Sequence, residues 1–126
     1  MYDITTRTKL GYDETIEKVK QELAKEGFGV LTEIDVKATF KKKLNLDFTD
    51  YIILGACNPP FARKALEAEI NLGLLLPCNV IVYADGEETV VSAIKPKEML
   101  SIAENKELIE IADEIEEKLE RVISNI

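Results

Sequence analysis

Two cysteines are the residues of this sequence with the most distinctive chemistry, and both stand beside an asparagine and a proline. The two junctions are Cys57-Asn58-Pro59 and Pro77-Cys78-Asn79. A thiolate is a nucleophile and a metal ligand, and the pKa of a thiol falls at the N-terminus of a helix. Because Asn58 followed by Pro59 is a typical helix start, Cys57 is a candidate for thiol chemistry.

A competing interpretation requires no chemistry of either cysteine. Free cysteine is among the most buried residue types and behaves in a core as a small apolar side chain. Cys57 and Cys78 would then be packing residues at the ends of two apolar segments. The sequence leaves both interpretations open.

The same junctions are the candidate ligand-binding site. The predicted ligand-binding residues are Cys57, Asn58, Pro59, Arg63, Pro77, Cys78 and Asn79. A helix that starts at Pro59 favours an anionic or polar group at its N-terminus. Arg63 and Lys64 are candidates for holding such a group, or are solvated surface residues. Glu67 and Glu69 face different ways on the same helix, and an acid–base role for either has no further support.

Whether the two cysteines meet depends on the direction of the strands that carry them. If the helix after Cys57 is a crossover connection, the strands before and after it are parallel, and the two thiols lie at opposite ends of the sheet. An intrachain disulfide is therefore disfavoured. A zinc site is disfavoured too, because two thiols without Cys-x₂-Cys spacing do not supply four ligands. We expect no metal and no cofactor.

Absent residue types exclude several classes of enzyme. The chain has no histidine, which excludes Ser-His-Asp catalysis, Cys-His catalysis and imidazole metal sites within one chain. None of its three serines stands in a Gly-x-Ser-x-Gly sequence. No glycine-rich phosphate loop is present either.

The charge balance argues against nucleic acid. The 126 residues carry a net charge of -8 with only three arginines, whereas phosphate binding needs clustered basic residues. The one basic run, Lys41-Lys42-Lys43, is predicted to be a solvated helix face. No apolar run approaches the roughly 20 residues of a membrane helix, and the N-terminus lacks the apolar core of a signal peptide. We expect a cytoplasmic protein without a nucleic-acid or membrane partner.

Apolar patterning predicts the elements that position the cysteines. Tyr51–Cys57 is nearly continuous in apolar residues, as expected of a central strand covered on both faces. A helix is predicted over residues 59–72 and is apolar around much of its girth, which is typical of a helix that is buried or meets a partner. Asn79–Tyr83 and Thr89–Ile94 are predicted to form a hairpin around the turn Asp85-Gly86.

The remaining elements follow from periodicity and end signals. Strands are predicted over residues 2–8 and 28–36, and helices over residues 13–27, 37–46, 96–102 and about 106–124. Asp13 is the predicted N-cap of the first helix and Gly27 its left-handed C-terminal residue. The strand over 28–36 alternates, which predicts one face on the core.

This order, β-α-β-(α)-β-α-β-β-α-α, predicts a single α+β domain over residues 1–126. We expect a mostly antiparallel sheet of about five strands with helices packed on it. The first six main elements match the split β-α-β pattern of ferredoxin-like sheets. The last helix is expected to cover an exposed face of the sheet, and part of its apolar stripe to meet a second subunit.

Several motifs, taken in order, resemble those of a known family. They are Gly11-Tyr-Asp-Glu-Thr15, Gly27-Phe-Gly-Val30, Ala56-Cys-Asn-Pro-Pro-Phe-Ala-Arg-Lys-Ala-Leu-Glu67, Leu75-Leu-Pro-Cys-Asn-Val-Ile-Val-Tyr83 and Val91-Ser-Ala-Ile-Lys-Pro96. Over roughly residues 2–100 the chain resembles the family catalogued as domain of unknown function 302. The resemblance implies a small α+β domain, a homodimer and no established activity, and it assigns no catalytic residue. The helix after Lys106 is its least diagnostic part.

Two hypotheses of different classes follow. The first is a homodimeric module that binds a small ligand without catalytic activity of its own, and it rests on the broadly apolar helix, the last helix and the missing catalytic residue types. The second is a thiol-based enzyme or sulfur carrier that uses Cys57, with Asn58 and backbone N–H groups steadying the thiolate. The sequence names neither a ligand nor a substrate.

Overall fold

The chain folds around one five-stranded antiparallel sheet. The computed structural model describes residues 1–126, and the strands lie in the order β1-β5-β4-β3-β2. The strands are β1 (Asp3–Thr8), β2 (Gly29–Asp35), β3 (Tyr51–Cys57), β4 (Cys78–Asp85) and β5 (Glu88–Ile94). The predicted α+β class, with an antiparallel sheet of about five strands, is confirmed.

Five α-helices and two short 3-10 helices connect or cover these strands. They are α1 (Tyr12–Lys25), α2 (Val36–Leu44), α3 (Pro59–Ala68), η1 (Ile70–Leu75), α4 (Pro96–Leu100), η2 (Ser101–Ala103) and α5 (Glu107–Ser124). None of them has the length and apolar character that a bilayer crossing requires.

Strands β2, β3, β4 and β5 are neighbours in the sheet as they are in the chain, so they form a meander. Strand β1 joins it at the far edge by pairing with β5. Strands β1 and β2, which α1 connects, run in the same direction as a split β-α-β unit requires, but three strands lie between them. The ferredoxin-like pattern therefore describes the order of elements along the chain but not the order of the strands in the sheet.

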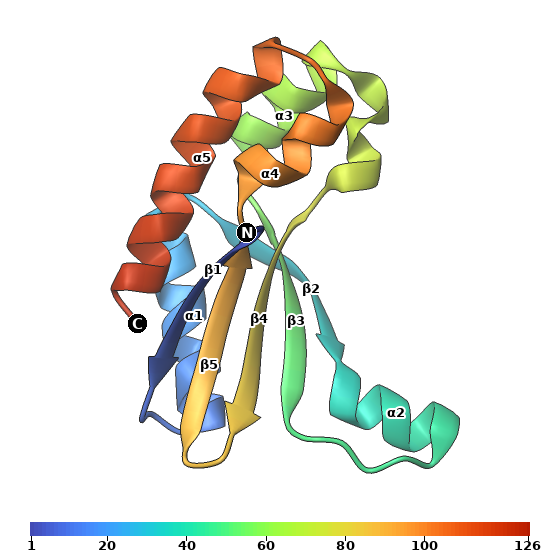
Figure 1. Cartoon of the computed structure of the whole chain (residues 1–126), viewed down its shortest axis with the longest axis vertical. Coiled ribbons are helices and arrows are strands. Elements are labelled where there is room, and N and C mark those ends of the chain that lie inside the picture. The colour runs from blue at the N-terminus through green and yellow to red at the C-terminus, as the bar shows by residue number, and fades with distance from the viewer.

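Helices α1 and α5 cover one face of the sheet, and no helix lies across the opposite, open face (Figure 1). The apolar stripe of α5 is the buried set Leu108, Ala112, Ile115, Leu119, Val122 and Ile123. It packs on β1, β5 and α1. The last helix thus covers the sheet as predicted, and its stripe is buried within its own chain.

Strand β2 departs from its predicted pattern. The alternation over residues 28–36 predicts one continuous core face, but the pairing with β3 shifts between Val30 and Thr32. Leu31 is the extra residue of this bulge, and such a residue reverses the side of the sheet on which later side chains fall. Phe28 is buried, whereas Ile34 is on the open face and 49% exposed. The prediction of a single half-buried strand face was wrong from Leu31 onward.

The ends of α1 show one correct and one incorrect prediction. Gly27 follows the helix with φ of 85°, and the N–H groups of Gly27 and Phe28 donate to the carbonyl oxygens of Ala24 and Leu23. This is a Schellman end, in which a left-handed residue favours glycine. The helix begins one residue before Asp13, because Gly11 is the N-cap.

Candidate functional site

The connection between β3 and β4 builds the candidate site. Helix α3 ends at Ala68, earlier than the predicted residue 72, and Glu69 is extended before η1 starts. The chain then returns to the end of the sheet that it left, so β3 and β4 pair antiparallel with Ala56 opposite Cys78. The alternative of parallel strands with distant thiols does not apply, because the segment after Cys57 is an excursion and not a crossover.

The two cysteines are therefore close neighbours at the same end of the sheet. Cys78 lies one residue from the position opposite Cys57, and side chains one residue apart in register point to opposite faces. Cys78 belongs to the core under α1 and α5, whereas Cys57 is half-buried. Both thiols are free, and opposed side-chain directions do not suit a disulfide.

A cavity of about 300 Å³ lies between this end of the sheet and the α3–η1 connection. Its lining residues are Leu31, Thr32, Ala56, Cys57, Asn58, Phe61, Ala62, Leu66, Gly73, Leu76, Pro77 and Cys78. Of the predicted ligand-binding residues it brings together Cys57, Asn58, Pro77 and Cys78. Three others lie outside it: Pro59, Arg63 and Asn79.

Sequence reasoning missed the contributions of β2 and η1 to this cavity. Leu31 and Thr32 come from the bulged part of β2, and Gly73 and Leu76 from η1 and the residue that follows it. No local pattern places β2 beside β3. The apolar face of α3 carried the one available signal, since Phe61 and Leu66 belong to it.

The cavity lining contains no charged side chain. Arg63, predicted to hold an anion, is 81% exposed and forms an ion pair of 2.9 Å with Glu67 on the outside of α3. Burial, with Cys57 nearby, raises the pKa of the Cys78 thiol to about 12. An uncharged apolar hollow of this size is at the small end of the range for ligand sites.

The N-terminus of α3 has few amide groups to offer a ligand. Pro59 and Pro60 occupy its first turn and have no N–H. The N–H of Phe61 donates to the side-chain oxygen of Asn58, the helix N-cap, over 3.4 Å. An anion in the cavity would therefore lack the hydrogen-bond donors that usually make a helix N-terminus an anion site.

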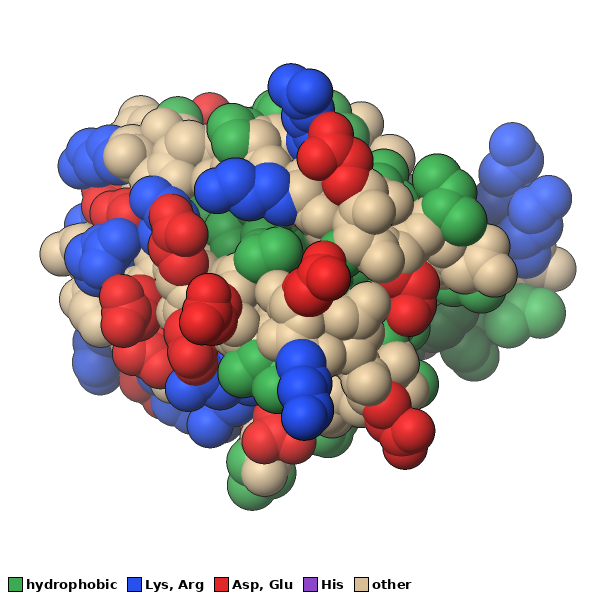
Figure 2. All heavy atoms as spheres, turned by 90° about the horizontal axis from the view of Figure 1, so that it is seen from above, with side chains coloured by type: hydrophobic (Ala, Val, Ile, Leu, Met, Phe, Trp, Pro, Cys, Tyr) green, Lys and Arg blue, Asp and Glu red, His purple; other side chains and the backbone are tan.

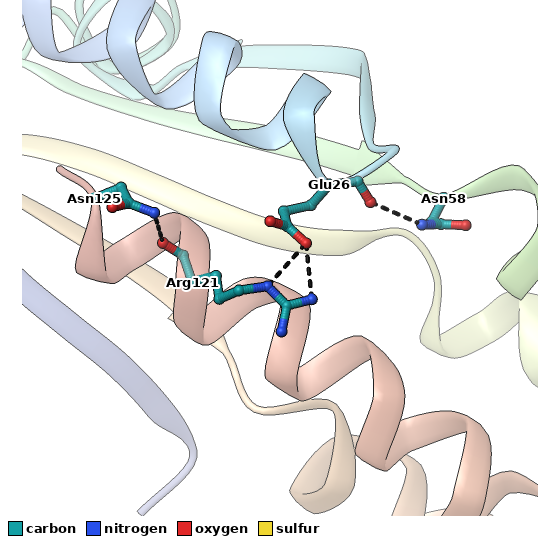
Figure 3. A network of polar contacts seen from close by, with 4 residues as sticks. All are labelled: Glu26, Asn58, Arg121 and Asn125. Carbon is teal, nitrogen blue, oxygen red and sulfur yellow. Dashed lines mark hydrogen bonds and ion pairs between the residues drawn. The ribbon is translucent and has the colours of Figure 1, made fainter.

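The side-chain nitrogen and oxygen of Asn58 each form one hydrogen bond within the fold. Its side-chain nitrogen donates to the carbonyl oxygen of Glu26 over 3.3 Å, and the carboxylate of Glu26 accepts two hydrogen bonds from Arg121 (Figure 3). A Cβ at Gly27 would lie 3.3 Å from the same nitrogen. Asn58 thus ties α3 to the end of α1, and through Glu26 and Arg121 to α5.

The floor of the cavity depends on a close approach at Gly55. A Cβ at this position would overlap the side chain of Thr32 and would lie 2.9 Å from Cγ of Pro77. The peptide bond between Leu76 and Pro77 is cis. Because Gly55 has no side chain, Thr32 of β2 and Pro77, which directly precedes β4, can pack against the backbone of β3.

A second hollow, of about 350 Å³, lies between α4, η2 and the first turns of α5. It is slightly larger, but it contains no thiol, and Lys97 at its rim is held by Asp113 at 2.6 Å. We place the candidate site at the cysteines, where side chains from β2, β3, α3, η1 and β4 converge. No group of three His, Cys, Asp or Glu side chains is arranged to hold a metal ion.

These features define a class of protein: a single α+β domain with an antiparallel five-stranded sheet and a helical excursion between β3 and β4. The family model described as "Domain of unknown function DUF302" matches residues 4–126, and the chain belongs to this family. The match includes α5, which was the least diagnostic part of the resemblance seen in the sequence.

A solved structure supports the same assignment. The crystal structure of an uncharacterized conserved protein DUF302 from Bacillus stearothermophilus is similar to this chain, with 34% sequence identity and a TM-score of 0.92. The similarity covers 99% of this chain and 98% of that one. None of the curated proteins matches the chain.

Proposed function

We propose that the protein is a homodimeric binding module without catalytic activity of its own, and that its ligand is a small, neutral and largely apolar molecule. The observation that carries the proposal is the uncharged cavity of about 300 Å³ beside the two cysteines. Apolar walls with a few polar groups are typical of small-molecule sites. Thr32, Asn58 and Cys57 are the polar side chains in this one.

The chemistry of the lining favours binding over catalysis. The chain has no histidine, and no carboxylate or amine lines the cavity to move a proton. The prolines at the start of α3 also remove two amide donors that would otherwise stabilise an oxyanion or a thiolate. A neutral ligand is therefore a better match than an anion.

One observation favours a second candidate function, a thiol-based enzyme or sulfur carrier. Cys57 is half-buried, lines the cavity and directly precedes the N-cap of α3. Rapid modification of Cys57 with an apparent pKa near or below 7 would support this function. Modification that becomes rapid only in alkaline solution would support the binding module.

The proposal is tested with N-phenyl-1-naphthylamine, a neutral apolar dye whose fluorescence rises in an apolar site. We expect saturable binding to the wild-type protein and at least tenfold weaker binding to Ala62→Trp, because the added ring fills the cavity. The matched control is Lys64→Trp, since Lys64 lies on the same helix but outside the cavity.

Dye binding and modification of Cys57 both report on the cavity. Bound dye should also slow the reaction of Cys57 with a maleimide, because both occupy the same space. Absence of saturable binding to wild type, or equal binding to Ala62→Trp and Lys64→Trp, would contradict the proposed site.

A further inference from the structure

The segment from Ile34 to Phe48, here called the α2 arm, projects from the edge of the domain. Helix α2 buries none of its nine residues and lies apart from the other helices (Figure 1). Ile34, Leu44, Leu46 and Phe48 are 49%, 66%, 48% and 40% exposed. An isolated helix of this length is marginal in water, and within its own chain the arm packs only at its base, against β2 and β3.

The arm has two chemically different sides. Figure 2 shows basic side chains on one side of the projecting end and apolar side chains on the other. Helix α2 contains four lysines and no acidic residue, although the chain as a whole has a net charge of -8. Lys42 and Lys43 form no ion pair.

The apolar side of the arm continues onto the open face of the sheet. The ring centroids of Phe40 and Phe48 are 5.0 Å apart, and those of Phe48 and Tyr51 are 6.3 Å apart. Tyr51 stacks on Tyr83 at 5.3 Å. Both tyrosines are on the open face, because Ile52, next to Tyr51, points into the core. One aromatic row thus joins the arm to the sheet.

A second uncharged row crosses the whole sheet beside it. The strand register places Ile34, Ile53, Ile81, Ser92 and Thr5 side by side on the open face. Five strands about 4.8 Å apart and about 20 Å long present roughly 400 Å² before side-chain relief is counted. The sheet face alone is thus about half of the roughly 800 Å² per partner of a standard interface, and the arm adds to it.

Charge and symmetry favour a second copy of this chain on that surface. Two copies with a net charge of -8 each repel, unless the contact brings opposite charges together. The basic arm and the acidic β4–β5 turn belong to the same chain. In this turn Asp85 and Glu88 share one cation, Arg7, and Glu87 forms no ion pair, so the turn keeps a negative charge. A two-fold axis that brings one arm to the other copy's acidic turn would form this contact twice. Pairing of β2 edges is disfavoured by the bulge at Leu31.

We propose that two copies pack through their open sheet faces, with the α2 arm of each lying over the sheet of the other. This inference rests on the homodimer of the proposed function and names its surface. Leu44 and Phe48 of one copy would be buried against the row of Ile53 and Ile81 in its partner. The exposed helix would gain in the dimer the contacts that it lacks in one chain.

The test is sedimentation of the full chain at micromolar concentration, where one chain has a mass of 14.1 kDa. We expect a dimer for wild type, and at least a tenfold increase in the dimer dissociation constant for Leu44→Glu and for Ile81→Glu. The matched control is Leu74→Glu, because Leu74 is 88% exposed on η1, away from the arm and the open face. Circular dichroism checks that each variant is folded.

Two results would overturn the inference: a wild-type monomer, or a dimer that both Leu44→Glu and Ile81→Glu leave intact. Dissociation by Leu74→Glu alone would likewise place the interface at η1. Dye binding is measured on the same samples, because it reports on the cavity independently. A monomer that binds the dye contradicts the dimer and supports the ligand site. A dimer that binds no dye supports the dimer and contradicts the ligand site.

Discussion

Burial distinguishes the two cysteine residues although they are close neighbours. Cys78 is 2% exposed with a thiol pKa of about 12, whereas Cys57 is half-buried at the cavity. Near pH 8 a pKa of about 12 leaves a thiolate fraction roughly a thousandfold below that of an ordinary thiol. We expect a chromogenic disulfide reagent to titrate one thiol in the native protein and two after denaturation. Cys57→Ser should abolish the native reaction and Cys78→Ser should keep it.

At Gly55 the expected effect is steric. Gly55→Ala places a methyl group against Thr32 and 2.9 Å from Pro77, and overpacking of this kind costs about 1–3 kcal/mol. Denaturant unfolding should show this loss, and Gly29→Ala should not, because a Cβ at Gly29 meets no atom within 4 Å. If the loss is steric, Thr32→Ala combined with Gly55→Ala should recover part of it. Equal effects of the two glycine substitutions would refute this explanation.

Among the elements, α3 depends on a single side chain at its start. Asn58→Ala removes the N-cap hydrogen bond to Phe61 and the hydrogen bond to the Glu26 carbonyl. A lost cap costs about 1 kcal/mol, and we expect a total of about 1–2 kcal/mol in the free energy of unfolding. Asn58→Ser keeps a cap but does not reach Glu26, so it should recover only part of the loss. A serine variant no more stable than the alanine variant would argue against the cap.

Sequence rules that depend on adjacent residues predicted the helices, strands and turns better than they predicted which strands pair. The turn at Asp85-Gly86, the cap at Asn58 and the left-handed Gly27 depend on a few adjacent residues, and the structure contains all three. The direction of β4 was beyond such rules, because a helix between two strands does not reveal whether the chain crosses the sheet or returns. The bulge at Leu31 likewise depends on the neighbouring strand.

The same limit applies to the candidate site. The four residues at the strand ends, Cys57, Asn58, Pro77 and Cys78, could be predicted to line a cavity from their sequence setting. The outward direction of Arg63 could not, because α3 ends early and its exposed face is fixed by packing on α5.

At the scale of the molecule, the pair of Glu26 and Arg121 joins the end of α1 to α5. The Arg121 guanidinium lowers the pKa of Glu26 below its ordinary 4.5. A lowered pKa stabilises the fold above pH 4.5, and this contribution is lost as the pH falls through the lower native value. We expect Arg121→Ala to lower the free energy of unfolding only slightly at pH 7, because solvent screens a half-exposed pair.

The measurement is denaturant unfolding of wild type and Arg121→Ala at pH 7 and in acid. The difference between them should shrink on acidification, because protonated Glu26 no longer attracts Arg121. The control is Arg63→Ala, which removes an exposed pair within one helix and should change stability less at pH 7. An equal difference between wild type and Arg121→Ala at both pH values would contradict the assignment to Glu26.

The edge position of β1 has a kinetic consequence. The meander from β2 to β5 forms through contacts between consecutive strands, whereas β1 pairs Asp3 with Ile94 and must close a loop that contains all four other strands. Loop-closure entropy makes such long-range pairing slow, so β1 should dock after the folding transition state. Pulse-labelled hydrogen exchange during refolding should protect the amides of β3 and β4 before those of β1. Folding would then be completed by β1, although β1 precedes the other four strands in the chain.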